Sequence, residues 1–382
     1  MASSITEASV LAAFDEKVRD GIVMYAEDME KIYHEDQGFK FEFRLTAALK
    51  SKPAAVEDNA ELDDADDEKG PSQTTSTSTS TSTSTTTANT VTPSHANTHT
   101  NDTKHTNDKI TLDEEGNLPG GDISIAGFEL TTIPSGGGEG DEEATHVLAF
   151  NKFCAYRPHL LLLTADGRRR QFEGLDKRDL GAAVEVLGGL NGGWGSDADA
   201  DSDKEKRRQE YLVIFNCGKE GGCSRLHKHM QAIPAPDAIP MWPDLVDSGP
   251  KTEADDSGKQ QQQQQEPPFR YFIHHFTGPS PPSKNDLTAS YKHMLRQATE
   301  LIPGREKVVE EDGDGRAVAV PHNVILGRRW IVVVPRVKAG VDGADVNAVG
   351  MLGVVWASKG ETVGKWRELG ARRVLGEVGV RR

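Results

Sequence analysis

Two low-complexity segments limit how much of this chain can fold. Residues 54–144 are rich in Asp, Glu, Ser, Thr, Asn and Gly, with an unbroken Ser/Thr run at residues 74–87, and residues 236–268 combine Pro, Asp and Gly with a glutamine tract. Such segments bury too little apolar surface to offset the entropy of ordering them. We therefore predict a disordered insert at 54–144 and a linker at 236–268, leaving roughly 250 residues for a folded core.

Charge and targeting features narrow the class of protein. The formal net charge is −16, from 60 acidic and 44 basic residues, which argues against a general affinity for nucleic acid. Many of the acidic residues lie in the inserts, so the folded part can still hold a basic pocket. The first residues lack the basic start and apolar core of a signal peptide, and no apolar run reaches membrane-spanning length. We expect a soluble cytoplasmic protein, with the nucleus as a second compartment, and no membrane or nucleic-acid partner.

Hydrophobic periodicity predicts the secondary structure of the remaining chain. Helical spacing predicts helices within residues 5–31 and at 178–191, 284–301 and 361–377. Apolar alternation and short apolar runs predict strands at 39–45, 145–150, 159–164, 211–215, 227–234, 269–276, 323–326, 330–335 and 351–357. Because strands and helices do not alternate regularly, we predict an α+β fold with antiparallel sheets and flanking helices.

The predicted elements divide the chain into five parts. Residues 1–53 supply the N-terminal helix and first strand of a catalytic domain, which continues at 145–235 after the insert. Residues 269–382 follow the linker and form a C-terminal domain. This last part is similar in character to the catalytic part without repeating its sequence, so we expect two related halves.

The segment at 221–231, Gly-Gly-Cys-Ser-Arg-Leu-His-Lys-His-Met-Gln, carries the strongest chemical signal. In a strand, His227, His229 and Gln231 point to one side. A neutral imidazole attacks phosphorus well and forms a labile phosphoramidate. We therefore predict His229 as a nucleophile whose tautomer is fixed by a backbone carbonyl or by His227. Gln231 and the N–H groups of the glycine turn would then bind phosphate oxygens.

Metal binding and a plain surface role are the alternatives for a His-x-His pair. The cysteines Cys154, Cys217 and Cys223 lack paired ligand spacing. The pair His274-His275 has no acid or thiol nearby at ligand spacing, and a further group of histidines lies in the low-complexity insert. We predict no metal held by protein ligands.

The motif His227-Lys-His229-x-Gln231 resembles the active-site strand of fungal-type diadenosine tetraphosphate phosphorylases (ATP adenylyltransferases). These enzymes are relatives of the galactose-1-phosphate uridylyltransferase branch of the histidine-triad superfamily. Further segments resemble the same family: Phe41-Glu-Phe-Arg44 with Lys52-Pro53, Asn151-Lys-Phe153, His159-Leu-Leu-Leu-Leu-Thr164, Phe215-Asn216, His322-Asn323-Val-Ile-Leu326, Arg328-Arg-Trp330, Pro335-Arg336, Asn347-Ala-Val-Gly350 and Gly353. The resemblance spans both ends of the chain and skips both inserts.

The resemblance implies a histidine-triad-like fold and a nucleotidyl transfer with no covalent cofactor. His229 would attack the phosphorus next to one adenosine, release ATP, and hold AMP until phosphate converts it to ADP. Mg²⁺ or Mn²⁺ would accompany the polyphosphate, and the partners are small nucleotides: diadenosine tetraphosphate, ATP, ADP and phosphate. The implied contacts to adenosine or phosphates are Lys52, Asn151, Lys152, Asn216, Gly222, Cys223, Ser224, Arg225, Gln231, Asn347, Ala348, Val349, Val354 and Ser358.

Several positions also have a plain structural interpretation or depart from the family pattern. Without the family resemblance, Lys52 would be interpreted as a solvated surface lysine. The residues Asn151, Asn216 and Asn347 would be interpreted as turn residues. The departures are Arg225 in place of a neutral amide, Gly327 in place of threonine, Val354 in place of serine or methionine, and Ser358 where a lysine is expected.

Two other functions stay open from the sequence. One is a histidine-triad hydrolase that passes the nucleotide to water, and the other is a non-catalytic nucleotide-binding protein. Hydrolases of this superfamily usually carry a third histidine where this chain has Gln231, so the glutamine favours transfer.

Overall fold

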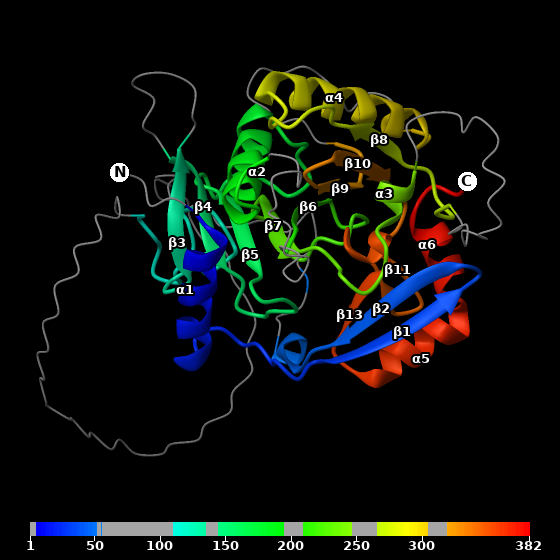
Figure 1. The fold of residues 1–382 in the computed structure, drawn as a ribbon, viewed down its shortest axis with the longest axis horizontal. Coiled ribbons are helices and arrows are strands. Elements are labelled where there is room, and N and C mark those ends of the chain that lie inside the picture. Colours follow the sequence, from blue (N-terminus) through cyan, green and yellow to red (C-terminus); the bar gives the residue numbers. More distant parts are fainter. Residues whose placement is uncertain are drawn as a thin grey trace, which may run out of the picture.

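An eight-stranded sheet forms the centre of the molecule (Figure 1). The computed structural model describes residues 5–51, 55, 110–134, 144–194, 209–246, 266–304 and 319–382. In spatial order the strands are β3 (Glu129–Pro134), β4 (Ala144–Phe150), β5 (Leu160–Thr164), β7 (His229–Pro234), β6 (Tyr211–Cys217), β9 (His322–Leu326), β10 (Trp330–Pro335) and β8 (Phe272–His275). Each neighbouring pair is antiparallel. The predicted α+β class with antiparallel sheets is confirmed.

The two halves of the chain meet inside this sheet rather than in separate domains. Strand β6 pairs along one edge with β7 and along the other with β9, where Asn216 lies opposite Asn323. The catalytic segment and the C-terminal part therefore share one hydrogen-bonded framework.

A smaller sheet joins the two ends of the chain. Its strands are β1 (Glu30–Asp36), β2 (Phe39–Leu45) and β13 (Val354–Ala357), and β13 runs parallel to β2, with Val354 opposite Glu42. A short antiparallel pair, β11 (Gly340–Val341) and β12 (Ala344–Asp345), precedes β13. The parallel pairing joins distant segments, so local periodicity could not predict it.

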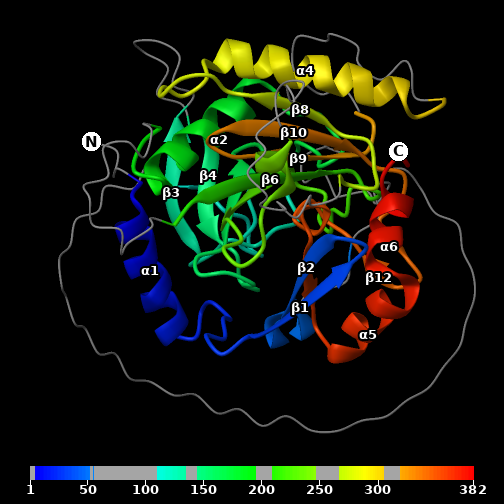
Figure 2. The ribbon, with the colours of Figure 1, turned by 45° about the vertical axis from the view of Figure 1, so that its right-hand side comes forward.

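Helices and the small sheet cover opposite faces of the large sheet (Figure 2). One face packs against α1 (Glu7–Arg19), α2 (Lys177–Leu190) and α4 (Lys284–Glu300). The other packs against β2, β13, α5 (Gly360–Leu369) and α6 (Ala371–Val378). Side chains of β6 alternate between the two, since Val213 and Phe215 join the first core and Leu212 and Ile214 the second. Short helical segments complete the elements: η1 (Ala47–Ser51), α3 (Trp242–Leu245) and η3 (Gly350–Leu352).

Two helix predictions need adjustment. The predicted helix at 361–377 is two helices, α5 and α6, because Gly370 between them adopts φ = +82°, a left-handed conformation that ends the first. The first helix ends at Arg19, well before residue 31, and the following chain leads into β1.

The two low-complexity predictions were too broad. Within 54–144, residues 110–134 include strand β3, and Leu118, Ile123 and Ile125 pack with Val147 and Leu163 in a third core cluster. Apolar residues spaced along this stretch supply a buried face that the average composition of the insert hides. Within 236–268, α3 buries Trp242, whose indole N–H donates to the carbonyl of Met351 (2.9 Å). The repeats themselves, at 74–87 and 260–265, lie outside the described residues.

Candidate active site

The backbone sets the chemistry of His229, the first residue of β7. Its Nδ1 lies 2.8 Å from the carbonyl oxygen of His227. A carbonyl only accepts hydrogen bonds, so Nδ1 carries the proton and Nε2 holds the lone pair. Met230 and Ala232 join the core under α2 and α4, so His229 and Gln231 face the opposite side of the sheet. Of the two partners that the sequence allowed for the tautomer, the structure selects the backbone carbonyl.

His227 is a fully buried residue just before β7. Its Nε2 lies 2.9 Å from the carbonyl oxygen and 3.1 Å from the hydroxyl of Thr164. Burial lowers the pKa of His227 to about 4, so its ring is neutral at physiological pH. A Cβ at Gly121 would come within 2.7 Å of Nδ1, which shows how closely the preceding segment covers the ring. The ring of His227 is thus held in place while its carbonyl orients His229.

Gln231 is oriented by His159, a residue of one of the family-like segments for which the sequence predicted no role. Nε2 of His159 lies 2.8 Å from Oε1 of Gln231, and its Nδ1 accepts from the backbone N–H of Ala155 (3.4 Å). With Nε2 as the donor, Gln231 offers its oxygen to His159, and its NH₂ remains for a phosphate oxygen. The His159 ring packs against Trp356 of β13, with ring centroids 5.2 Å apart. Asn151 lies next to this pair, with its Nδ2 3.3 Å from Nε2 of His159; both nitrogens are donors in this tautomer, so this is a contact without a hydrogen bond.

The glycine-bearing loop after β6 lies against the segment at 346–348. Gly222 adopts φ = +86°, and a Cβ there would stand 2.5 Å from the carbonyl oxygen of Val346, so only glycine fits without displacement. Asn216 accepts hydrogen bonds at Oδ1 from the backbone N–H of Ala348 (2.7 Å) and from Nδ2 of Asn323 (3.0 Å). The structure therefore brings three predicted positions, Asn216, Gly222 and Ala348, together from distant parts of the chain.

A buried arginine supports this junction. Arg336 is fully buried and donates to Oδ1 of Asn323 (2.5 Å), to the carbonyl of Val346 (2.9 Å) and to the carbonyl of Val378 (3.2 Å). Burial lowers the pKa of Arg336 to about 9, so the guanidinium is charged at neutral pH. Its hydrogen bonds to neutral oxygens leave a positive charge behind the loop, where a polyphosphate would benefit from it.

Behind the catalytic strand lies a buried ion pair. Lys228 points to the face opposite His229, where Nζ lies 2.6 Å from Oδ2 of Asp179 in α2 and 2.6 Å from the carbonyl of Gly174. Oδ1 of Asp179 lies 2.9 Å from Nε2 of His146 in β4. Burial alone would raise the pKa of Asp179, but the charge of Lys228 and the contact with His146 outweigh it and hold that pKa well below its usual value. The pair anchors α2 to the segment that carries the predicted nucleophile.

The remaining predicted residues are placed unevenly. Lys52 lies outside the described residues. Lys152 is exposed, Ser224 and Asn347 are half-buried, Cys223 is buried, and the half-buried Arg225 donates to the carbonyl of Ser224 (3.0 Å). The side chains of Val349 and Val354 are buried in the core beneath the small sheet. Ser358 is half-buried at the end of β13.

Sequence reasoning assigned no role to three residues that surround the predicted triplet. They are His159, Gln171 and Asp122. The carboxylate of Asp122 accepts hydrogen bonds from the backbone N–H groups of Leu226 (2.9 Å) and His227 (2.8 Å). Only His159 had a signal, as part of a family-like segment. Asp122 lies in a segment with insert-like composition, and Gln171 follows an unpatterned run of arginines.

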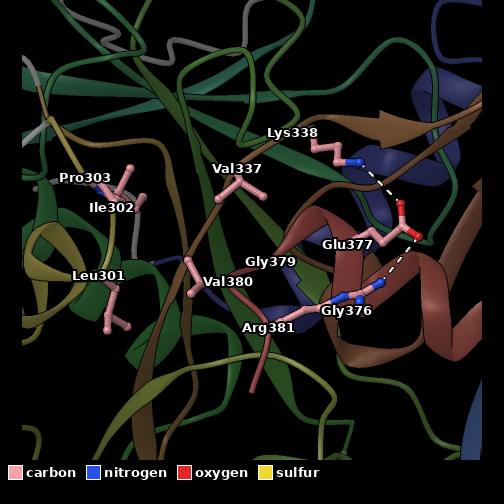
Figure 3. Close-up of a pocket in the computed structure, with 10 residues that line it drawn as sticks. All are labelled: Leu301, Ile302, Pro303, Val337, Lys338, Gly376, Glu377, Gly379, Val380 and Arg381. Carbon is pink, nitrogen blue, oxygen red and sulfur yellow. Dashed lines mark hydrogen bonds and ion pairs between the residues drawn. The ribbon is translucent and has the colours of Figure 1, made fainter.

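A surface cavity near the C-terminus lies apart from the predicted residues on β7. Within the described ranges, no group of three or more His, Cys, Asp or Glu side chains is arranged to hold a metal ion. No helix in the same residues is long and apolar enough to cross a membrane. A cavity of about 440 Å³ lies near the C-terminus, where Lys338 and Arg381 both contact Glu377 (Figure 3). Its lining carries two cations and one carboxylate, and it contains none of the predicted site residues.

The chain is similar to known proteins in sequence and in fold. Residues 265–381 match the family described as ATP adenylyltransferase C-terminal domain. The chain is 26% identical over 231 residues to diadenosine 5',5'''-P1,P4-tetraphosphate phosphorylase 2 of Saccharomyces cerevisiae, covering 59% of this chain and 65% of that protein. It is 27% identical over 273 residues to protein APA1 of the same yeast, covering 69% of this chain and 77% of that one.

The fold agrees over a longer span than the sequence. A crystal structure of yeast Ap4A phosphorylase Apa2 in complex with Ap4A matches with a TM-score of 0.61 and 18% identity, covering 100% of this chain and 99% of that one. The C-terminal part of the chain thus matches the ATP adenylyltransferase C-terminal domain, and the chain is similar in sequence to two yeast proteins and in fold to yeast Ap4A phosphorylase Apa2.

Proposed function

We propose that this protein is a nucleotidyltransferase that phosphorolyses diadenosine tetraphosphate to ATP and ADP through an AMP-histidine intermediate at His229. The observation that carries the proposal is the hydrogen bond from Nδ1 of His229 to the carbonyl of His227 (2.8 Å), because it leaves the Nε2 lone pair as the nucleophile. The related yeast phosphorylase and the Ap4A-bound Apa2 structure support the choice of substrate.

The first half-reaction forms a phosphorus–nitrogen bond. Nε2 of His229 attacks the phosphorus next to one adenosine, the bond from that phosphorus to its bridging oxygen breaks, and ATP leaves with the electron pair. As Nε2 becomes bonded, positive charge develops on the ring, and the carbonyl of His227 stabilises the proton on Nδ1. The NH₂ of Gln231, turned outward by His159, donates to the phosphorus oxygens as they gain charge.

The second half-reaction reverses the first with another nucleophile. An oxygen of inorganic phosphate attacks the AMP phosphorus, the phosphorus–nitrogen bond breaks, the lone pair returns to Nε2, and ADP leaves. Because the AMP is held covalently, it can also be passed to the terminal phosphate of ATP, which breaks the phosphorus–nitrogen bond and makes the dinucleotide. We further propose that Mg²⁺ or Mn²⁺ enters bound to the polyphosphate.

Intact mass spectrometry tests the intermediate directly. Protein incubated with diadenosine tetraphosphate in the absence of phosphate should gain the mass of one AMP, because the second half-reaction lacks its acceptor. His229→Ala should gain nothing, whereas the control His293→Ala, at an exposed position on α4, should behave like wild type. Adding phosphate should then release ADP and restore the original mass.

The hydrolase alternative gives a different outcome in the same experiment. If water discharged His229, AMP would accumulate without phosphate and phosphate would not change the product. If neither an adduct nor turnover formed with any nucleotide, the protein would be a binding protein and the proposed transfer would be wrong.

A further inference from the structure

Gln171 lies beside the nucleophile on the irregular segment that follows β5. Its side chain is buried (1% exposed), and neither its sequence context nor the proposed reaction gives it a task. We propose that Gln171 is a positioning residue: its amide fills a gap between β6 and β7 and fixes the backbone of His229 and of the glycine-bearing loop. The inference rests on the proposed function, because it concerns how that nucleophile is held.

The gap follows from the strand register. Strands β6 and β7 pair from Tyr211 opposite Pro234 to Ile214 opposite Gln231, and there the pairing ends. Continued by one more step of two residues, the same register would place Asn216 opposite His229. Asn216 has no partner in β7 in this ladder, although it still pairs on its other edge with Asn323 of β9. The two strands therefore separate at the position where the nucleophile begins β7.

The amide of Gln171 takes up the backbone groups that this separation exposes. Oε1 accepts from the backbone N–H of His229 (2.7 Å), and Nε2 donates to the carbonyl of His229 (2.9 Å) and to the carbonyl of Asn216 (3.0 Å). The donors and acceptors allow only this orientation of the amide, because two carbonyls face one end and an N–H group faces the other. One side chain thus replaces the missing rung between the two strands.

The backbone of Gln171 holds the loop between these strands in the same way. Its N–H donates to the carbonyl of Leu226 (2.7 Å), and its carbonyl accepts from the N–H of Gly218 (3.1 Å). Gly218 and Leu226 mark the two ends of the glycine-bearing loop. A single residue therefore fixes the nucleophile and the proposed phosphate-binding loop relative to each other.

This arrangement explains why the strands can separate without freeing the nucleophile. Strand separation gives the imidazole room to reach a phosphate, but it removes the ladder that would hold His229. A misplacement of the reacting atom by about 1 Å can reduce the rate about 100-fold. Gln171 should therefore affect the rate of covalent transfer more than the binding of the nucleotide.

The substitution Gln171→Glu tests this, because it keeps shape and removes both donors. Its carboxylate would face the carbonyls of His229 and Asn216. The matched control is Gln209→Glu at the other end of the same strand pair, where Nε2 donates to the carbonyls of Glu210 (2.9 Å) and Ala235 (3.2 Å). We expect Gln171→Glu to lower kcat about 100-fold with little change in KM, and Gln209→Glu to leave both near wild type.

The pH dependence separates positioning from simple damage. Protonation of the new carboxyl restores a donor and removes its charge, so kcat of Gln171→Glu relative to wild type should rise as pH falls. The same ratio for Gln209→Glu should stay flat. If Gln171→Glu does not fold, Gln171→Met, which keeps the length without polar groups, should show the same loss of kcat with unchanged KM.

A measurement without nucleotide keeps this test independent of the proposed reaction. Histidine-selective ¹⁵N spectra, with His229 identified by its absence in His229→Ala, report which ring nitrogen carries the proton. We expect a single Nδ1-protonated tautomer in wild type and in Gln209→Glu, and a mixture in Gln171→Glu. If His229 keeps its tautomer and kcat falls less than severalfold in folded Gln171 variants, the positioning role is wrong. If wild type forms no AMP adduct but the tautomer changes as expected, only the proposed function fails.

Discussion

Two buried histidines in the large sheet, His229 and His322, make the same kind of hydrogen bond at Nδ1 but differ in the surroundings of Nε2. Nδ1 of His229 lies 2.8 Å from the carbonyl of His227, and Nδ1 of His322 lies 2.7 Å from the carbonyl of Val320. In both cases the carbonyl belongs to the residue two positions earlier, so both rings have the same tautomer. The backbone contact that fixes the tautomer of the predicted nucleophile therefore recurs at a second histidine of the described residues.

The second ring nitrogen makes the difference. Nε2 of His322 accepts from the hydroxyl of Tyr291 (2.9 Å), and that hydroxyl oxygen accepts from the N–H of Leu175 (3.0 Å). The ring is fully buried, and burial lowers the pKa of His322 to about 4. His229 instead lies at the start of its strand, keeps 7% exposure, and follows the glycine-bearing loop. Nε2 of His322 therefore bonds within the core, whereas His229 lies next to the loop that carries the predicted phosphate-binding positions.

The largest expected difference between the two histidines is in turnover. His229→Gln should lower kcat by about 1000-fold or more, because it removes the atom that bonds to phosphorus. His322→Gln should keep most of the activity, since a glutamine oxygen can still accept from Tyr291. Steady-state assays with diadenosine tetraphosphate and phosphate measure both. An equally large loss in a folded His322→Gln variant would contradict the comparison.

A smaller effect concerns stability against acid, to which the buried, neutral rings of His227 and His322 contribute in the same way. The pKa values of His227 and His322 are about 4 in the folded protein, against 6.5 as the ordinary value. Below about pH 6.5 the unfolded chain takes up protons that the folded chain does not, so the free energy of unfolding falls as the pH falls. By about pH 5 the expected loss is about 2 kcal/mol for each histidine.

Urea unfolding between about pH 7 and about pH 5 measures this loss. His322→Gln should show a shallower fall in unfolding free energy over that range, because only His227 then remains as a buried histidine with a lowered pKa. An unchanged slope in this variant would mean that His322 does not contribute to the acid sensitivity.

The smallest expected effect separates structure from chemistry at His322. Tyr291→Phe removes the hydroxyl that bridges His322 and the N–H of Leu175, leaving two buried polar groups without that partner. The expected cost is about 2 kcal/mol of unfolding free energy, measured by denaturant titration. Because the hydroxyl faces α2 and not the nucleophile, kcat should stay at the wild-type value. A fall in kcat without a fall in stability would place Tyr291 in the catalytic machinery instead.

Sequence periodicity was sufficient for part of the secondary structure and for the polar face of strand β7. Alternation placed β2 and β7, and helical spacing placed α2 and α4, because these signals depend on neighbours a few residues apart. The same alternation placed His229 and Gln231 on one side of β7. The average composition of residues 54–144 wrongly predicted disorder throughout, since residues 110–134 have a buried face within an otherwise polar insert.

The tertiary structure decided how these residues work together. His159 orients Gln231, Asp122 accepts from the backbone at His227, and Gln171 replaces a rung of the sheet beside His229. Each contact joins segments that are far apart in the chain, and Gln171 gains its role only where β6 and β7 separate. The sequence alone determined which residue types stand at the nucleophile and on which face. Their orientation depended on hydrogen-bond partners that only folding brings within reach.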